Sequence, residues 1–341
     1  MIIKEINIDD YLAFYKNGEE LSLFYQINWL NSVSEAYSLE WQLLGCFSKD
    51  QLIIAFPVNI RKLFSIIKIA GSPLPGIGAA ITPISFFKET EVEVFIRAVE
   101  KWAKSQRIFY FNLYMPITSN SLTFSSYVEH EWVDNLELPL EKPLEELWRG
   151  IKSEARNRIR KAVRNGVKVH WFKTKDSIQI YWKLIESTYN NHQQIKPLIS
   201  REMCEATYNN LLDNGLKIIG ATYQGHVIAM LWIMYDGNRC YFWNGASNQQ
   251  LRHLNANHLL HWEIIKWGKR KGIKVYDLFG RAKKSGIGGH RPGIARFKKS
   301  LGGKRVNYMK VLICPAWLRI GISIYRKILA MKYMPKRSEK S

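Results

Sequence analysis

The sequence is poor in cysteine, and its cysteines are widely spaced. Only four occur among 341 residues, and none lies in a CxxC pair or beside a histidine at the spacing of metal ligands. A disulfide framework and a structural zinc site are therefore not expected, and the pattern is typical of a reducing compartment. The four residues are Cys46, Cys204, Cys240 and Cys314.

We expect neither a secretion signal in residues 1–20 nor a membrane-spanning apolar run. Residues 1–20 include acidic side chains where a signal peptide needs a basic segment followed by an apolar one. The most apolar late stretch, Val311–Met334, is interrupted by Pro315 and by basic residues, so it does not meet the roughly 20 apolar residues needed to span a bilayer. We expect a cytoplasmic, metal-free and cofactor-free protein that ends in a basic amphipathic helix and tail over residues 313–341.

Acidic residues are scarce in the second half of the chain. Residues 1–148 contain 12 basic and 19 acidic side chains, whereas residues 149–341 contain 38 basic and 10 acidic ones. The net charge of +21 therefore comes from the second half. Such a field attracts phosphates, which RNA, a nucleotide-linked substrate, coenzyme A and an anionic membrane surface all provide.

Hydrophobic periodicity predicts a similar order of elements twice. In the first part we expect strands at 2–8, 41–47, 52–60 and 108–114 and helices at 9–16, 28–37 and 89–105. In the second part we expect strands at 167–172, 216–223, 226–235, 239–245 and 274–278 and helices at 176–192, 200–213 and 257–271. Pro139 and Pro143 mark a junction over residues 136–148. The sequence thus predicts an α/β chain with mixed sheets flanked by helices, in two tandem domains, 1–138 and 139–312.

Three stretches of the second half carry a specific combination of motifs. They read LEELWRGIKSEARNRIRKAVRNGVKV from Leu144, CYFWNGASN from Cys240 with NHLLHWEIIKWGKRKGIKVYDLFG from Asn257, and GIARFKKSLGG from Gly293. In this order and spacing they resemble the Fem family, which attaches amino acids to peptidoglycan precursors, and the related CelD-like acyltransferases. The resemblance implies two GNAT-like domains with a cleft between them, and acylation of an amine by an aminoacyl-tRNA or an acyl thioester.

One departure from ordinary GNAT acetyltransferases bears on the donor. Those enzymes hold the pyrophosphate of coenzyme A in an R/Q-x-x-G-x-G/A turn, whereas the segment from Gly245 reads GASNQQLRHLNAN and has no such glycine pair. We therefore prefer aminoacyl-tRNA over an acyl thioester as the donor. The resemblance implies bacterial cell-wall biosynthesis, with an amine-bearing envelope precursor as the acceptor.

Two other functions stay open at this point. One is a CelD-like enzyme that acylates a polysaccharide nitrogen or oxygen from an acyl thioester. The other is a non-catalytic RNA- or membrane-binding protein that retains the duplicated fold, because a fold alone does not guarantee chemistry.

Two residues are candidates for catalysis. In the Fem family the lysine at the place of Lys298, which follows Phe297, is associated with stabilising the oxyanion formed as the amine attacks the ester. A fixed cation suits that task because negative charge develops there; the alternative is a surface lysine. Asp277 is the only acid between Lys266 and Lys310, among fifteen basic residues. It is expected to act as a base or amine anchor, or else to pair with those cations.

A basic helix supplies the first group of candidate binding residues. Its stripe, Lys152, Arg156, Arg160 and Arg164, follows i, i+4 spacing and therefore shares one side of the helix. Ten basic residues and a single acid lie between Arg149 and Lys175, which favours a phosphate-bearing partner over a solvated face. We expect the stripe to contact tRNA phosphates, with Arg156 and Arg160 exposed.

Aromatic residues form the second group. Tyr241 and Trp243 alternate on one face of a predicted strand, and with Phe297 they are candidates to bind substrate in a cleft, although such stripes are more often core. In the C-terminal helix, Trp317 and Ile320 share an apolar stripe, which either contacts an anionic membrane peripherally, at its inner face, or packs on the second domain.

Overall fold

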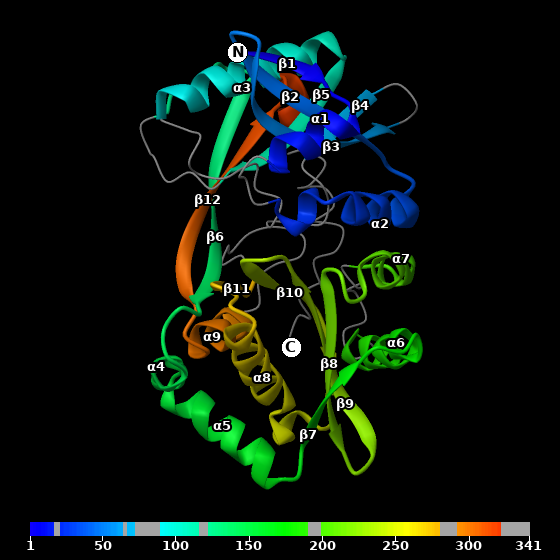
Figure 1. Ribbon diagram of the computed structural model, residues 1–341, viewed down its shortest axis with the longest axis vertical. Coiled ribbons are helices and arrows are strands. Elements are labelled where there is room, and N and C mark those ends of the chain that lie inside the picture. The colour runs from blue at the N-terminus through cyan, green and yellow to red at the C-terminus, as the bar shows by residue number, and fades with distance from the viewer. Residues whose placement is uncertain are drawn as a thin grey trace, which may run out of the picture.

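The computed structural model describes most of the chain (Figure 1). The described segments are residues 1–16, 21–63, 67–71, 89–115, 122–189, 199–279 and 292–321. Of the predicted C-terminal helix, residues 316–321 are helical, and the part beyond 321 lies outside the described residues. Within the described segments, no helix has the length and apolarity to cross a membrane.

The first half of the chain alternates helices and strands much as its periodicity predicts. Its elements are β1 (Ile2–Glu5), α1 (Ile8–Lys16), η1 (Leu23–Tyr25), α2 (Ile27–Tyr37), β2 (Glu40–Ser48), β3 (Gln51–Leu63), β4 (Ile67–Gly71), α3 (Glu89–Ser105), β5 (Ile108–Met115) and β6 (Val128–Pro139). The predicted junction is wrong over residues 136–139, which end β6. Pro139 is tolerated because it is the last residue of the strand, where a missing N–H interrupts no inner part of the ladder.

The second half follows the predicted order and adds a strand. Its elements are α4 (Leu144–Gly150), α5 (Ser153–Arg164), β7 (Lys168–Phe172), α6 (Asp176–Tyr189), α7 (Arg201–Leu211), β8 (Leu216–Tyr223), β9 (His226–Tyr235), β10 (Arg239–Ser247), η3 (Arg252–Leu254), α8 (Ala256–Arg270), β11 (Val275–Asp277), α9 (Pro292–Ser300) and β12 (Lys304–Ile313). The expectation that the apolar stretch from Val311 is helical is wrong at its start. Met309, Val311 and Ile313 are buried at every second position of β12, the period of a strand.

All the described strands form one mixed sheet. Their order is β1-β2-β3-β4-β5-β12-β6-β11-β10-β9-β8-β7. The pairs β4–β5 and β10–β11 are parallel, and the other pairs are antiparallel. β12 comes late in the chain but lies between β5 and β6 and pairs with both, so the two halves share one sheet (Figure 1). A helix-flanked mixed sheet is confirmed, whereas the domain boundary at 138 and 139 stays a prediction.

Helices cover both faces of the sheet in the second half. α5 and α8 pack on one face, where Ile159, Leu260 and Ile264 are buried, and α6 and α7 lie on the other, with α2 against α7 (Figure 1). Burying such an aliphatic side chain contributes about 1.5 to 3 kcal/mol. The sheet therefore forms a rigid support for side chains that its strands direct toward α5 and α8.

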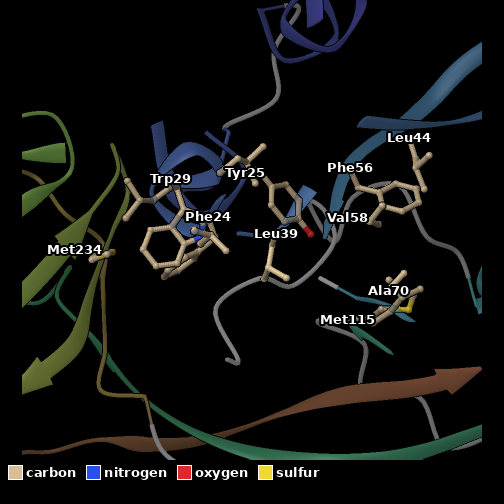
Figure 2. Close-up of a cluster of buried hydrophobic side chains, with 14 of the residues drawn as sticks. Phe24, Tyr25, Trp29, Leu39, Leu44, Phe56, Val58, Ala70, Met115 and Met234 are labelled. Atoms are coloured by element: carbon tan, nitrogen blue, oxygen red, sulfur yellow. The ribbon is translucent and has the colours of Figure 1, made fainter. Parts of the chain in front are cut away.

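An aromatic cluster connects the two halves on the other face. Phe24 and Trp29 lie near Met234 of β9 (Figure 2). The Phe24 ring is 4.8 Å from that of Tyr241, and the Trp29 ring is 6.0 Å from that of Trp243, both in edge-to-face contact. Such pairs add to the burial energy of the rings, so this cluster helps to hold η1 and α2 against β10.

Candidate active site

Two parallel strands part near the middle of the sheet. β10 and β11 pair at three positions, the last of which joins Tyr241 to Asp277. β11 ends at that pair, whereas β10 continues to Ser247 with an irregularity between Phe242 and Asn244. Asp277 therefore lies at the end of a central strand, as predicted, where β10 and β11 separate.

A cavity of about 950 Å³ lies beside β10. Its walls come from β9, β10, the first turns of α5 and α8, and α9. This volume is in the range of ligand-binding sites, which span about 300 to 1,000 Å³. The wall residues used below are Arg158, Phe242, His258, His261, Phe297 and Lys298. Two residues predicted from the motifs, Phe297 and Lys298, thus line the same cavity.

Lys298 is a buried cation in this wall. It lies in the last turn of α9 and is only 7% exposed. Its Nζ donates a hydrogen bond to the carbonyl oxygen of Phe279 and lies 5.4 Å from the centre of the Phe242 ring. Burial lowers the pKa of Lys298 to about 8, while the charge of Asp277 opposes the shift. The side chain is therefore still mainly an ammonium ion at neutral pH.

Two glycines follow α9 where the chain turns back past Leu278, just after β11. Gly302 has a φ of 97°, a left-handed conformation that side chains rarely adopt. A Cβ on Gly303 would lie 3.0 Å from Leu278 Cδ1 and 3.1 Å from the carbonyl oxygen of Lys298. The glycine pair of the third motif thus lets the chain turn tightly from α9 into β12.

Asp277 is buried among hydrogen-bond donors. It is 2% exposed, and the amide Nδ2 of Asn135 lies 3.0 Å from each of its carboxylate oxygens. Burial raises the pKa of Asp277 to about 6; Glu137 adds to the rise and Arg239 opposes it. The carboxylate therefore titrates closer to neutrality than an ordinary aspartate.

Phe279 connects Asp277 to Lys298. Its backbone N–H donates to Asp277 Oδ1 at 2.8 Å, and its carbonyl oxygen accepts from Lys298. Its φ is 42°, a left-handed conformation that is rare and strained for an aromatic residue. The hydrogen bond to Asp277 therefore stabilises the turn that points a carbonyl at Lys298.

The motifs missed four residues that complete this polar network. Arg239 Nη2 lies 2.7 Å from Glu137 Oε1 and 3.5 Å from Asp277 Oδ2. Glu137 also accepts from Tyr308 and, at 3.2 Å, from Asn135. Burial acts to lower the pKa of Arg239, but Asp277 and Glu137 outweigh it, so the pKa is raised and Arg239 stays charged.

Two of these four residues belong to a pattern that is visible in the sequence. Asn135 and Glu137 alternate with Leu136 and Leu138, which is the period of a strand with a polar face. Pro139 and Pro143 nevertheless favour a junction between domains at this place. Arg239 shows no local signal because its carboxylate partners lie on strands far away in the chain.

The histidines of α8 form a neutral part of the cavity wall. Burial lowers the pKa of His258 to about 4 and that of His261 to about 3. The Phe297 ring packs 4.8 Å from the first and 5.2 Å from the second, and the Tyr276 hydroxyl lies 2.8 Å from His261 Nδ1. Phe297 thus braces α9 against α8. Across the described residues, no cluster of His, Cys, Asp and Glu is arranged to hold a metal.

The predicted basic stripe divides into two parts. Lys152, Arg160 and Arg164 are exposed, and the guanidinium of Arg160 lies 5.4 Å from the centre of the Trp148 ring. Arg156, expected to be exposed, is half-buried: it donates to the carbonyl oxygens of Arg149, at 2.9 Å, and Ile151. Those carbonyls end α4 and need donors, so Arg156 caps a helix.

Tyr241 and Trp243 lie in the core and not in the cavity wall. They are 2% and 9% exposed, and the Tyr241 hydroxyl donates to Asp236 Oδ2 at 2.9 Å. Both belong to the aromatic cluster between the two halves. The structure therefore favours the core alternative that the sequence left open for this aromatic pair.

A match in the second half of the chain supports an acyltransferase of the GNAT type. Residues 149–299 match the family model described as an acetyltransferase (GNAT) domain. This match, which includes α5, the cavity and Lys298, favours an enzyme over the non-catalytic alternative. A comparison with curated proteins finds no match.

Solved structures share the whole fold at low sequence identity. FemX is similar with a TM-score of 0.67 and 12% identity, over 91% of this chain and 97% of that one. L-PGS from Bacillus licheniformis has a TM-score of 0.55 and 12% identity, over 95% and 97% of the two chains. A tandem GNAT protein from the clavulanic acid biosynthesis pathway has 0.53 and 10%, over 91% and 96%. The predicted tandem GNAT fold of the Fem type is thereby confirmed.

Proposed function

We propose that this acyltransferase moves an aminoacyl group from a charged tRNA to an amine on a bacterial cell-envelope precursor, in the cytoplasm. The observation that carries the proposal is that α5 links exposed basic residues to the cavity wall. Arg158 lines the cavity, while Arg160 and Arg164 of the same helix are exposed. A polyanion held along α5 would bring its terminal ester to the cavity that contains Lys298.

Lys298 supplies a cation where the reaction develops negative charge. As the amine attacks the ester carbonyl, a C–N bond forms and the carbonyl oxygen becomes an oxyanion. The ester C–O bond then breaks, and the ribose hydroxyl leaves with a proton that the amine gives up. A preorganised ammonium in a site shielded from water stabilises the oxyanion more than a solvated one. No covalent enzyme intermediate is needed, because the ester is already activated.

Asp277 acts in this proposal as a positioning residue. Its carboxylate is 2% exposed, is not in the wall of the described cavity, and accepts hydrogen bonds on both oxygens. It holds the left-handed turn at Phe279, whose carbonyl oxygen in turn orients Lys298. The competing proposal is the base or amine anchor expected from the sequence, which requires substrate to reach the carboxylate.

An acyl thioester is the alternative donor. The family model that matches is named for acetyl transfer, and the cavity has the volume of a small-molecule site. Asn255, Ala256 and Asn257 at the start of α8 also line it, and the first turn of a helix favours an anion because its N–H groups lack acceptors in the preceding turn. Against a thioester stands the missing glycine pair between β10 and α8.

The test is a transfer assay with each donor. The chain is incubated with charged tRNA or with acyl-CoA, each with a UDP-linked muropeptide, and the acceptor is analysed by mass spectrometry. A muropeptide heavier by one aminoacyl residue, seen only in the tRNA arm, supports the proposal. Acyl transfer from acyl-CoA alone supports the alternative, and an unchanged muropeptide in both arms contradicts the acceptor assignment. The Lys298→Met variant serves as the inactive control.

A further inference from the structure

A second cavity, of about 510 Å³, lies at the opposite end of α8 from the candidate active site. Its wall includes Lys271, directly after the helix, whereas Ala256 at the helix start lines the first cavity. The nearest wall residues on α8, His261 and Trp267, are six positions apart, about 9 Å at the rise of an α-helix, and the described walls share no residue. The second cavity is therefore a separate site.

Aromatic side chains form one side of this cavity. Trp171 lies on β7, the edge strand of the sheet, and is 39% exposed, which is unusual for so large an apolar group. Its ring is 5.6 Å from that of Trp267, which is buried and makes an edge-to-face contact with Tyr235 at 5.4 Å. Trp171 is thus held by a strand and by a second tryptophan while part of its surface stays open.

Lysines surround the aromatic side. Lys173 and Lys217 share one acid, Asp213, at 3.5 Å and 2.7 Å, so two cations face a single carboxylate. Lys271 is exposed and has no carboxylate partner among the residues that the structure describes.

The other acid in the wall is already engaged. Asp236 accepts from the backbone N–H groups of Asn238 and Arg239 at 3.1 Å and 2.7 Å, and from the hydroxyl of Tyr241 at 2.9 Å. Its oxygens are therefore occupied by other donors, and three lysines against two carboxylates leave the described wall with a net positive charge.

We propose that this second cavity binds a nucleobase with its attached phosphate. The base stacks on Trp171, and the phosphate is held by Lys271 and Lys173. A flat ring beside cations fits this chemistry, because every base presents a π-face and stacking on an aromatic side chain is tolerant of sequence. The volume is that of a small-ligand site. The proposal does not depend on which donor the first cavity uses.

The test separates stacking from simple charge attraction. The wild-type chain and Trp171→Ala are titrated by calorimetry with UMP, ribose 5-phosphate and a short single-stranded RNA. Stacking of one base corresponds to about 5- to 150-fold in affinity, so Trp171→Ala weakens binding by that factor, and Trp171→Phe restores most of it. Ribose 5-phosphate, which has no base, binds at least as weakly as UMP binds to Trp171→Ala.

A lysine pair provides the matched control. Lys271→Ala flattens the dependence of log K on log salt by about 0.7 for a single strand. Lys269→Ala leaves it unchanged, because Lys269 is nearby on α8 but donates to the carbonyl oxygen of Glu141 at 2.6 Å. Circular dichroism confirms that each variant is folded.

The arms also identify the source of the nucleotide. Saturable binding of UMP that depends on Trp171 indicates a free or metabolite-linked nucleotide. Trp171-dependent binding of the RNA without binding of UMP indicates an RNA strand. If neither ligand's affinity changes in the folded Trp171→Ala variant, or if ribose 5-phosphate binds as tightly as UMP, the proposal is wrong.

Discussion

The two halves of the sheet bury different kinds of side chain. In the described part of the first half, up to β5, Glu100 is the one buried residue among the carboxylates, lysines and histidines. It lies near the protein surface and accepts hydrogen bonds from Lys104 at 2.5 Å and from Ser125 at 3.0 Å. Apart from Ser32 and Asn59, the other buried residues described there are apolar or aromatic. Among the residues described from β6 onward, the buried carboxylates, lysines and histidines are Glu137, His258, His261, Asp277 and Lys298.

This contrast distinguishes the part of the sheet that has a structural role from the part that contains the candidate active site. Burying a charge costs several kcal/mol unless it is paired and hydrogen-bonded, so a chain selected only for stability has little reason to bury Glu137, Asp277 and Lys298 in one region. Perturbed groups that converge on a cavity are typical of functional sites. The part up to β5 supplies an apolar core and the strands β1 to β5 of the shared sheet, and the part from β6 onward supplies the buried titratable groups of the candidate site.

The largest expected effect comes from removing the buried cation. Lys298→Met keeps the length of the side chain and removes its charge, so we expect turnover to fall by about 10²- to 10³-fold, the usual effect of losing one oxyanion donor. Steady-state kinetics should show the loss in kcat, with little change in KM. Lys299→Met is the control, because Lys299 is exposed. Equal turnover in wild type and Lys298→Met would remove Lys298 from the mechanism.

The next effect sharpens the role of Asp277. Asp277→Ala removes the acceptor for the Phe279 N–H and leaves Arg239 with one fewer carboxylate, so we expect kcat to fall by about tenfold or more. Asp277→Asn keeps an oxygen for the Phe279 N–H, so a positioning role predicts substantial recovery of kcat. A catalytic base predicts that asparagine is as inactive as alanine. Glu100→Gln, in the first half, should alter the melting temperature and leave kcat unchanged.

The pH profile tests the same comparison. Because the pKa of Lys298 is about 8, the ammonium is lost as pH rises through that value, and kcat should fall above it. Lys298→Arg keeps its charge, so the kcat of that variant should not fall near pH 8.

The free energy of unfolding should change with pH in the opposite direction to kcat. Between the folded pKa of Lys298, about 8, and its unfolded value, about 10.4, the unfolded state binds more protons than the folded state. The stability of wild type relative to Lys298→Met should therefore rise with pH in that window. A kcat that stays level from pH 7 to 10 in wild type would contradict the assignment.

A smaller effect is expected on the surface of α5. Arg160→Gln and Arg164→Gln should each flatten the log K versus log salt slope for tRNA by about 0.7 to 0.9, if each removes one phosphate contact. Arg156→Gln is unsuitable for this test, because its guanidinium caps α4 and its loss should lower stability. A raised KM for the acceptor with unchanged tRNA affinity would assign the stripe to the acceptor. If neither the KM for the acceptor nor the affinity for tRNA changes, the basic stripe of α5 is a solvated face.

The smallest effect concerns membrane contact. Trp317 and Ile320 are 62% and 59% exposed, while Arg319 is held by Glu129 at 2.8 Å. Replacing Trp317 and Ile320 by alanine should weaken salt-sensitive sedimentation with anionic vesicles by a few-fold, since each change removes apolar area from the interface. Neutral vesicles are the control. Unchanged sedimentation would favour packing of this segment on the protein.

Local patterns predicted most elements but not their neighbours in the sheet. Helices such as α3 and α8 and strands such as β8 and β9 follow apolar periods within 8 to 17 residues, which the sequence displays directly. The apolar periods predict no strand at β4, β6 or β12. Val133 pairs with Tyr308 although about half the chain separates them, and no local period encodes such a partner.

The sequence by itself determined the one-sided charge, the order of most elements and the motif that contains Lys298. These are properties of composition and short-range period, which do not depend on what packs against them. Only the tertiary structure decided that Asp277 meets Asn135, Glu137 and Arg239, and that Arg156 turns inward. Those contacts depend on which strands become neighbours, and that choice is made by burial of the whole sheet between its helices.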